Sequence, residues 1–252
     1  MTFDSPKNDR IHELRQLFKE AFGDSDDFLD VFFGKAFSHD RCRCATENGR
    51  IVAALYWFDC VCNGRKAAYL YAVATSEAYR RRGIGKALLD NTHDFLASQG
   101  YSLALLVPGS ESLFGYYERA GYAICGYVSE FICNASSERI DLRRIGAGEY
   151  AALRRKLLPE NSVIQEGVSL EFLSELAELY AGDGFVLACV RNGEAASGIE
   201  LLGDKSLAPS ILNTLGLKSG RFRIHNGKKP FAMFRPLEES VTPPAYLGLA
   251  FD

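Results

Sequence analysis

The sequence predicts an α/β (α+β) fold, with a mixed, mainly antiparallel central sheet flanked by helices and followed by a smaller α+β domain. Three observations support this prediction. A strand pattern, a basic turn with glycines and a helix pattern follow one another between Tyr69 and Asp90. Asn-Gly pairs at Asn48 and Asn63 separate alternating segments, as hairpin turns separate antiparallel strands. Helix and hairpin patterns of the first half recur in the second.

The stretch from Tyr69 to Asp90 reads YLYAVATSEAYRRRGIGKALLD. The first N–H groups of a helix have no partner inside the helix, and the helix dipole adds partial positive charge, so phosphate oxygens can bind there. Gly83 and Gly85 have no Cβ, which lets a ligand approach the backbone closely. The turn before the helix is therefore a candidate anion-binding site.

Two common phosphate-binding motifs do not fit this turn. A P-loop requires Lys followed by Ser or Thr after its second glycine, but Lys86 is followed by alanine. A dinucleotide-binding fingerprint requires Gly or Ala three residues after Gly85, where this chain has Leu88. The spacing Arg80-x-x-Gly83-x-Gly85 instead closely resembles the acyl-CoA pyrophosphate loop of the GCN5-related N-acetyltransferases (GNAT).

The composition is that of an ordinary globular protein. The 252 residues can form one large domain or two small ones, and 47% of them are hydrophobic and 24% charged. A net charge of -3 argues against a general polyanion binder, so we expect no nucleic-acid partner. The longest apolar run, residues 51–58, is shorter than the ~18 residues of a membrane span, and the N-terminus shows no secretory pattern. We expect no membrane partner and a cytoplasmic protein.

Seven cysteines in a chain with no visible export signal predict reduced thiols rather than disulfides. Cys42-x-Cys44 and Cys60-x-Cys62 suggest zinc ligands, but both pairs fall in alternating, strand-like segments. Structural zinc sites usually place two to four residues between paired cysteines, at turns. We therefore expect no metal, and cysteines that are buried as small hydrophobic side chains.

Apolar periodicity and turn residues predict the other elements of the first half. The expected helices span residues 9–22, 24–32, 83–100 and 111–120, and the expected strands span residues 41–47, 50–62, 65–75 and 103–107, with a final strand pair within 122–133.

This order of elements resembles the GNAT fold over about residues 9–134, and we expect a GNAT domain that binds acetyl-CoA at residues 1–134. A second motif, from Tyr117 through Gly121 to Tyr122, resembles the family's Tyr-x-x-x-Gly-aromatic signature. In that family the tyrosine hydroxyl lies near the thioester sulfur.

Residues 139–252 are expected to form a degenerate GNAT-like domain after a polar linker. Residues 27–29 correspond to residues 171–173, and Asn48-Gly49 corresponds to Asn192-Gly193, but no second Arg-x-x-Gly-x-Gly follows. The tandem arrangement resembles the enhanced-intracellular-survival group of acetyltransferases, without the sterol-carrier-like third domain of that group. The expected strands of this half span residues 185–191, 194–202, 220–225 and 230–234, with a helix at 206–215.

The resemblance implies an N-acetyltransferase that transfers an acetyl group from acetyl-CoA to a primary amine by direct attack. Tyr117 is then the acid that protonates the departing sulfur, a role that suits a phenol with a pKa near ~10. The residues expected to bind acetyl-CoA are Val73, Ala74 and Thr75 along the pantetheine, Arg80, Arg81, Arg82, Gly83, Ile84, Gly85 and Lys86 at the pyrophosphate, and Ser110 and Glu111 before the last helix.

The general base is not identified by the sequence. The strand at residues 65–75, where many GNAT relatives place a catalytic Glu, contains no carboxylate and no histidine. Asp59 and Glu130 are candidates, although a structural or solvent-facing role explains each as well. By resemblance to the tandem group, the C-terminal Asp252 is a third candidate, and a route through water is equally compatible.

The competing prediction is a non-catalytic acyl-CoA-binding sensor or regulatory module. The motif at Tyr117 favours an enzyme, whereas the missing base favours the module. The expected partners are acetyl-CoA and a small-molecule or peptide amine, and a homo-oligomer is compatible with the sequence. The aromatic segment at residues 56–58 suits an apolar or cationic acceptor, or equally a strand packed in a core.

Overall fold

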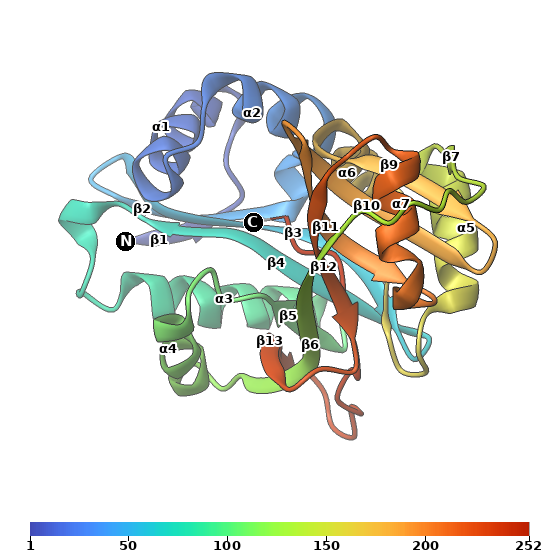
Figure 1. The fold of residues 1–252 in the computed structure, drawn as a ribbon. Helices are drawn as coiled ribbons and strands as arrows, with labels where there is room; N and C mark the ends of the chain where they lie inside the picture. The colour runs from blue at the N-terminus through green and yellow to red at the C-terminus, as the bar shows by residue number, and fades with distance from the viewer. Residues whose placement is uncertain (252) are drawn as a thin grey trace. The chain divides into compact units, whose positions relative to one another are not determined.

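The computed structural model describes residues 1–251, which form two compact units (Figure 1). Unit 1 contains Met1–Ala123 and Met233–Thr242, and unit 2 contains Ile124–Ala232 and the chain from Pro243 onward. Within residues 1–251, no helix is long and apolar enough to cross a membrane.

Unit 1 is built on strands in the order β1-β2-β3-β4-β5-β13. Neighbouring strands are antiparallel, except that β4 and β5 are parallel. Asn48 and Asn63 have φ values of 50° and 51°, as the hairpin prediction requires. The strands are β1 (Thr2–Asp4), β2 (Cys42–Glu47), β3 (Arg50–Cys62), β4 (Arg65–Thr75), β5 (Leu103–Leu106) and β13 (Lys229–Pro236).

Helices cover both faces of this sheet, with α1 and α2 on one face and α3 and α4 on the other (Figure 1). Gly23 ends the first helix with a φ of 74°, and the Ser25 hydroxyl caps the second by accepting the Phe28 N–H at 3.2 Å. The predicted helices are confirmed as α1 (Ile11–Phe22), α2 (Asp26–Val31) with a π-helical turn η2 (Phe32–Ala36), α3 (Ile84–Ser98) and α4 (Phe114–Arg119), with short turns η1 (Asn8–Arg10), η3 (His39–Arg41), η4 (Glu77–Tyr79) and η5 (Glu111–Leu113).

The expectation of a strand pair within residues 122–133 is wrong. This segment is one continuous strand, β6 (Ala123–Asn134), because it lacks a two-residue hairpin turn and Gly126 alone, with a φ of 68°, does not reverse the chain. The strand beside β5 in unit 1 is instead Met233–Pro236 of β13. The predicted strand at 230–234 therefore exists, but its end belongs to unit 1.

Unit 2 has the strand order β6-β12-β11-β10-β9-β7, and only β11 and β12 are parallel. The two units thus share one pattern of parallel and antiparallel neighbours. The domain boundary expected after residue 134 stays a prediction. The structure confirms the hairpin predicted at residues 185–202 as β10 and β11, the helix predicted at 206–215 as η6 and α7, and the strand predicted at 220–225 as β12. The elements of this half are β7 (Arg143–Arg144), α5 (Ala147–Leu157), β8 (Val163–Gln165), α6 (Val168–Leu176), β9 (Glu178–Gly182), β10 (Phe185–Asn192), β11 (Ala195–Leu202), η6 (Lys205–Leu207), α7 (Ala208–Thr214) and β12 (Ser219–His225).

The expected burial of the paired cysteines is confirmed. Cys42 and Cys44 lie on the same face of β2 with their sulfurs 3.9 Å apart, and Cys60 and Cys62 are also buried on β3. Burial raises the pKa of the Cys60 thiol above its ordinary range, so this side chain stays a neutral thiol.

A fully buried carboxylate, Glu200, links a helix of unit 2 to its C-terminal segment. Its two oxygens accept hydrogen bonds from Arg154 at 2.7 and 3.0 Å, from the Tyr150 hydroxyl at 3.0 Å and from the Tyr246 hydroxyl at 3.0 Å. The Arg154 side chain is 1% exposed and that of Glu200 is 0% exposed. A buried charge is tolerated only when it is paired and hydrogen-bonded, so this network fixes α5, β11 and the final segment together.

A buried histidine, His93, lies on α3 in unit 1. Its Nε2 is 2.7 Å from the Tyr122 hydroxyl, and the Tyr122 ring packs 5.8 Å from that of Tyr117. Burial, reinforced by the positive charge of Arg235, lowers the pKa of His93 to about 3. The ring is therefore neutral at physiological pH and acts as a hydrogen-bonding partner of Tyr122.

Replacing Arg154 with Met should destabilise unit 2 by ~3–5 kcal/mol, because the Glu200 charge would remain buried without its cation. Urea unfolding measures the loss. The matched control is Arg155→Met, since this neighbour pairs with Glu166 at the surface and should contribute less than ~1 kcal/mol. Equal losses in the two variants would contradict the assigned role of the buried pair.

The free energy of unfolding should fall by about 2 kcal/mol between pH 7 and pH 5, because His93 takes up a proton only in the unfolded chain. The folded state depresses the pKa of His93, so only the unfolded chain takes up this proton below pH ~6.5, and the loss grows as the pH falls toward about 3. His93→Gln should remove this share of the pH dependence in urea titrations. His12→Gln, which changes an exposed histidine, should retain it, and a His93 variant with an unchanged slope would disprove the assignment.

Candidate acyl-CoA site in unit 1

The parallel pair β4–β5 separates partway along β4. The two strands pair only from Ala67–Leu103 to Tyr69–Leu105, whereas β4 continues to Thr75. On its other side β4 remains paired with β3 as far as Thr75. Beyond Tyr69, no strand within residues 1–251 pairs with the β5-facing edge of β4. Unpaired backbone groups along a strand can bind an extended ligand by adding hydrogen bonds to the ladder.

A β-bulge interrupts β4 beside this open edge. The pairing of β3 with β4 shifts by one residue between Ala54 and Tyr56, and Ala72 adopts a φ of 52°. A non-glycine residue in this conformation costs on the order of 1–3 kcal/mol, and such strain concentrates at functional sites. Bulges also redirect the backbone next to active sites. The bulge therefore sets the direction of the Val73 peptide, where the predicted cofactor-binding segment begins.

The basic turn after β4 leads into α3, whose N-terminus has no side-chain cap. Gly83 is the N-cap of α3, with a φ of 76°, and no side chain in the described chain caps it. Arg81 also has a positive φ, 62°, and residues 80–83 are all exposed. The first N–H groups of this 15-residue helix thus have no side-chain cap, as an anion-binding helix start requires.

The basic side chains of this turn differ in what they contact. Arg80 Nε donates to the Thr75 carbonyl at 3.1 Å, which ties the turn to the end of β4. Arg82 donates to Glu47 at 3.1 Å and lies over the Tyr79 ring at 5.0 Å. Lys86 pairs with Asp90 at 2.6 Å. Within residues 1–251, Arg81 makes no hydrogen bond or ion pair, so its charge is available to a ligand.

Gly85 brings three segments together. A Cβ at this position would lie 2.9 Å from the Tyr116 hydroxyl and 3.2 Å from Thr75 Oγ1. A Cβ would force the Tyr116 hydroxyl, and to a smaller extent that of Thr75, to shift, so glycine lets α3 begin close to both α4 and the end of β4. The second glycine of the motif thus serves packing as well as access to the backbone.

Two neighbouring tyrosines on α4 are candidate proton donors. Tyr117 is 7% exposed, and its ring packs against Tyr116 at 5.1 Å and against Tyr122 at 5.8 Å. Burial raises the pKa of Tyr117 above its ordinary range, and burial together with the charge of Asp90 also raises the pKa of Tyr116. Both hydroxyls are therefore protonated at neutral pH. The Tyr116 hydroxyl lies beside Gly85, so the structure keeps both residues as candidates.

The two residues predicted before the last helix are exposed. Ser110 shares a hydrogen bond of 2.9 Å with Ser112, and Glu111 begins η5. Their contact with a cofactor stays a prediction.

The base candidates named from the sequence have other partners. Asp59 accepts a hydrogen bond from the Tyr101 hydroxyl and lies 3.5 Å from Arg41. In unit 2, Glu130 lies 3.1 Å from Lys229 and 3.7 Å from Arg223. Burial opposes the shift, but the hydrogen bond and charge of Lys229 lower the pKa of Glu130, which makes this carboxylate a weaker base. Asp252 lies outside the described residues.

Comparison with known proteins relates this geometry to a family. Residues 2–125 match the model of the family described as Acetyltransferase (GNAT) domain, and no curated protein matches the chain. The matched residues include the open edge of β4, the basic turn, α3 and α4.

Solved structures share the fold over both halves of the chain. A GCN5-related N-acetyltransferase from Kribbella flavida has a TM-score of 0.69 at 17% identity, covering 94% of this chain and 72% of that one. One from Anabaena variabilis has a TM-score of 0.74 at 12% identity, with coverages of 94% and 73%. Eis1 from Mycobacterium abscessus has a TM-score of 0.67 at 14% identity, with coverages of 94% and 74%.

At such identities the structural likeness shows the fold, and the family match places residues 2–125 in the same group. Both findings agree with the open strand edge and the uncapped helix start described above. Residues 2–125 therefore form a GNAT acetyltransferase domain, and the chain shares its fold with GNAT-type N-acetyltransferases.

Proposed function

We propose that this protein transfers an acetyl group from acetyl-CoA to a primary amine. The observation that supports this most directly is the open edge of β4, which leads into the uncapped start of α3. An extended pantetheine chain has amide groups that can pair with a strand edge, and it ends in a diphosphate that suits a helix start. Acetyl-CoA combines these features with a transferable acyl group.

The cofactor would lie along β4 with its phosphates at the turn. Val73, Ala74 and Thr75 offer backbone groups to the pantetheine, and the N–H groups of residues 83–86 offer hydrogen bonds to the pyrophosphate. Arg81 adds a charge that no other described residue uses. Because the turn is exposed, part of this attraction should be screened by salt.

The reaction requires one bond to form and one to break. The amine nitrogen attacks the thioester carbonyl carbon, the C–S bond breaks, and the thiolate receives a proton or a hydrogen bond from a tyrosine hydroxyl. Tyr117 is the proposed donor, and Tyr116 is the alternative. An amine with a pKa of ~10.4 must first lose a proton, which costs about 4.6 kcal/mol at pH 7. We assign this proton to water, since Asp59 and Glu130 are engaged in ion pairs.

Unit 2 has a different helix start in the corresponding place. After β11, Asp204 accepts hydrogen bonds from the Ser206 N–H at 2.9 Å and from its hydroxyl at 2.7 Å. Asp204 thus caps the short turn η6 that leads into α7, and its negative charge at this helical start disfavours a phosphate there. This supports binding of one acetyl-CoA per chain, by unit 1.

Gly83→Glu should abolish CoA binding, because it places a negative side chain where the phosphates are proposed to lie. A Cβ at Gly83 meets no atom within 4 Å, so the expected cost to folding is the strain of a positive φ. The matched control is Gly100→Glu, which has a φ of 77° and equally open surroundings at the other end of α3. Calorimetry with CoA compares them, and equal affinity in two folded variants would refute the turn as the phosphate site.

Tyr117→Phe keeps the ring packing but removes the proton donor. It should therefore bind acetyl-CoA almost normally and lower kcat and kcat/KM together, by ~10²- to 10⁴-fold for a general acid. Steady-state kinetics with any accepted amine, run beside Tyr116→Phe, shows which hydroxyl acts. Full activity in both variants would contradict tyrosine-assisted departure of the thiolate.

A further inference from the structure

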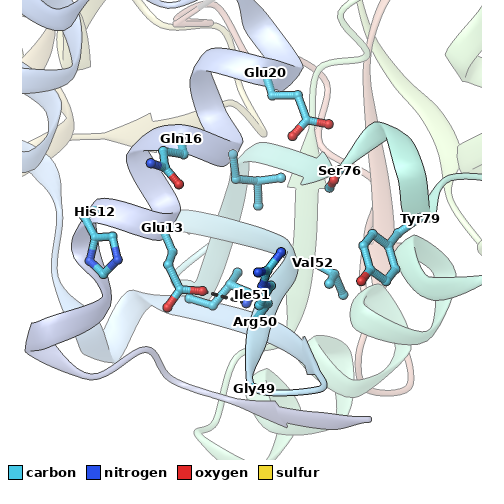
Figure 2. A pocket seen from close by; sticks show the side chains of 11 residues that line it. His12, Glu13, Gln16, Glu20, Gly49, Arg50, Ile51, Val52, Ser76 and Tyr79 are labelled. Carbon is cyan, nitrogen blue, oxygen red and sulfur yellow. Dashed lines mark hydrogen bonds between the residues drawn. The ribbon is translucent and has the colours of Figure 1, made fainter.

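Unit 1 contains a pocket that the proposed acetyl transfer does not use. It lies between α1 and the start of β3, has a volume of about 520 Å³ and is bounded by Ser76 and Tyr79 near the end of β4 (Figure 2). This volume lies within the range of small-molecule sites. Its lining residues are His12, Glu13, Gln16, Leu17, Glu20, Gly49, Arg50, Ile51, Val52, Ser76 and Tyr79.

The pocket combines an apolar floor with a polar rim. Leu17, Ile51 and Val52 are buried and form the apolar part of its lining. In Figure 2 the Glu20 carboxylate, the Arg50 guanidinium and the Tyr79 ring point into the space above them. An apolar floor with a few convergent polar groups is the usual construction of a ligand site.

One lining carboxylate is already neutralised. Glu13 accepts hydrogen bonds from Arg10 at 2.7 and 2.9 Å and from the Ile51 N–H at 2.9 Å. The hydrogen bond from Arg10 is the main cause that lowers the pKa of Glu13. Glu13 is therefore a structural anion that fixes α1 against the start of β3, and it offers no free charge to a ligand.

The charges that remain have opposite signs. The side chain of Arg50 makes no hydrogen bond or ion pair with any residue of 1–251. One oxygen of Glu20 accepts the backbone N–H of Glu77, which leaves its negative charge without a cationic partner among the described residues. Glu20 and Arg50 form no ion pair with each other in this part of the chain. Both residues are exposed, so water solvates them in the free protein, and two opposite charges on one rim suit a ligand that carries both charges.

We propose that this pocket binds the zwitterion of a free amino acid with an apolar side chain. Arg50 would receive the carboxylate in the fork geometry of a guanidinium, and Glu20 would receive the ammonium group. The side chain would contact Leu17, Ile51 and Val52, where burial of apolar surface adds affinity. The Tyr79 and Ser76 hydroxyls, which make no hydrogen bonds within residues 1–251, lie on the same lining. The site is independent of acetyl transfer.

Calorimetry with L-leucine tests the ligand class, because two analogues each remove one charge. L-leucinamide lacks the carboxylate and 4-methylpentanoate lacks the ammonium group. Leucine should show saturable binding below ~10 mM, and each analogue should bind about three- to tenfold more weakly, as expected for charged hydrogen bonds at a partly exposed site.

Charge-neutral variants then assign the two ends of the ligand. Arg50→Gln should weaken leucine binding by about three- to tenfold but leave the affinity for leucinamide unchanged. Glu20→Gln should weaken leucine equally and leave 4-methylpentanoate unchanged. Lys19→Gln, which removes a neighbouring charge on α1 that pairs with Asp26, is the control and should bind leucine normally. No saturable binding, or equal affinity for all three compounds, would overturn the proposal.

Discussion

The separation of β4 from β5 after Tyr69 is the feature on which the candidate active site depends. A parallel ladder that continued to Thr75 would satisfy the backbone of β4 and leave nothing for a ligand to pair with. Because the ladder stops, β4 keeps hydrogen-bonding groups on one edge while β3 holds the other. The bulge at Ala72 and the turn that starts α3 then lie along one continuous edge. A strained residue inside a strand is tolerated here because β3 and the helices hold the rest of β4 in place.

The two units share one strand order but differ at the helical segment that follows the fourth strand. In unit 1 the helix that follows the fourth strand starts at Gly83 without a side-chain cap. In unit 2 the turn η6 that leads into α7 is capped by Asp204, whose carboxylate accepts the Ser206 N–H and hydroxyl and adds a negative charge there. Unit 2 instead places a fully buried ion pair, Arg154 with Glu200, in its core. Both oxygens of Glu200 are engaged by Arg154, Tyr150 and Tyr246, so the pair serves the packing of unit 2.

Local sequence predicted most of the elements because their signals are local. Asn-Gly hairpins, the apolar stripe of α1 and the glycines of the basic turn depend only on neighbouring residues, and each was found where the pattern placed it. The assignment of the end of β13 to unit 1, where it pairs with β5, could not be predicted in this way. The pairing of Met233–Pro236 with β5 depends on which strand edge is available after folding, and strands from both halves carry similar alternation.

By itself, the sequence determined the strand–turn–helix motif and the aromatic signature, and hence the family that residues 2–125 match, because these motifs require particular residue types at fixed spacing. Only the tertiary structure decided what surrounds them. It placed the Tyr116 hydroxyl beside Gly85, so Tyr116 becomes a candidate next to Tyr117. It also brought residues from α1, β3 and η4 around one pocket. Those residues are distant in the chain and have no shared spacing, so their proximity comes from packing alone.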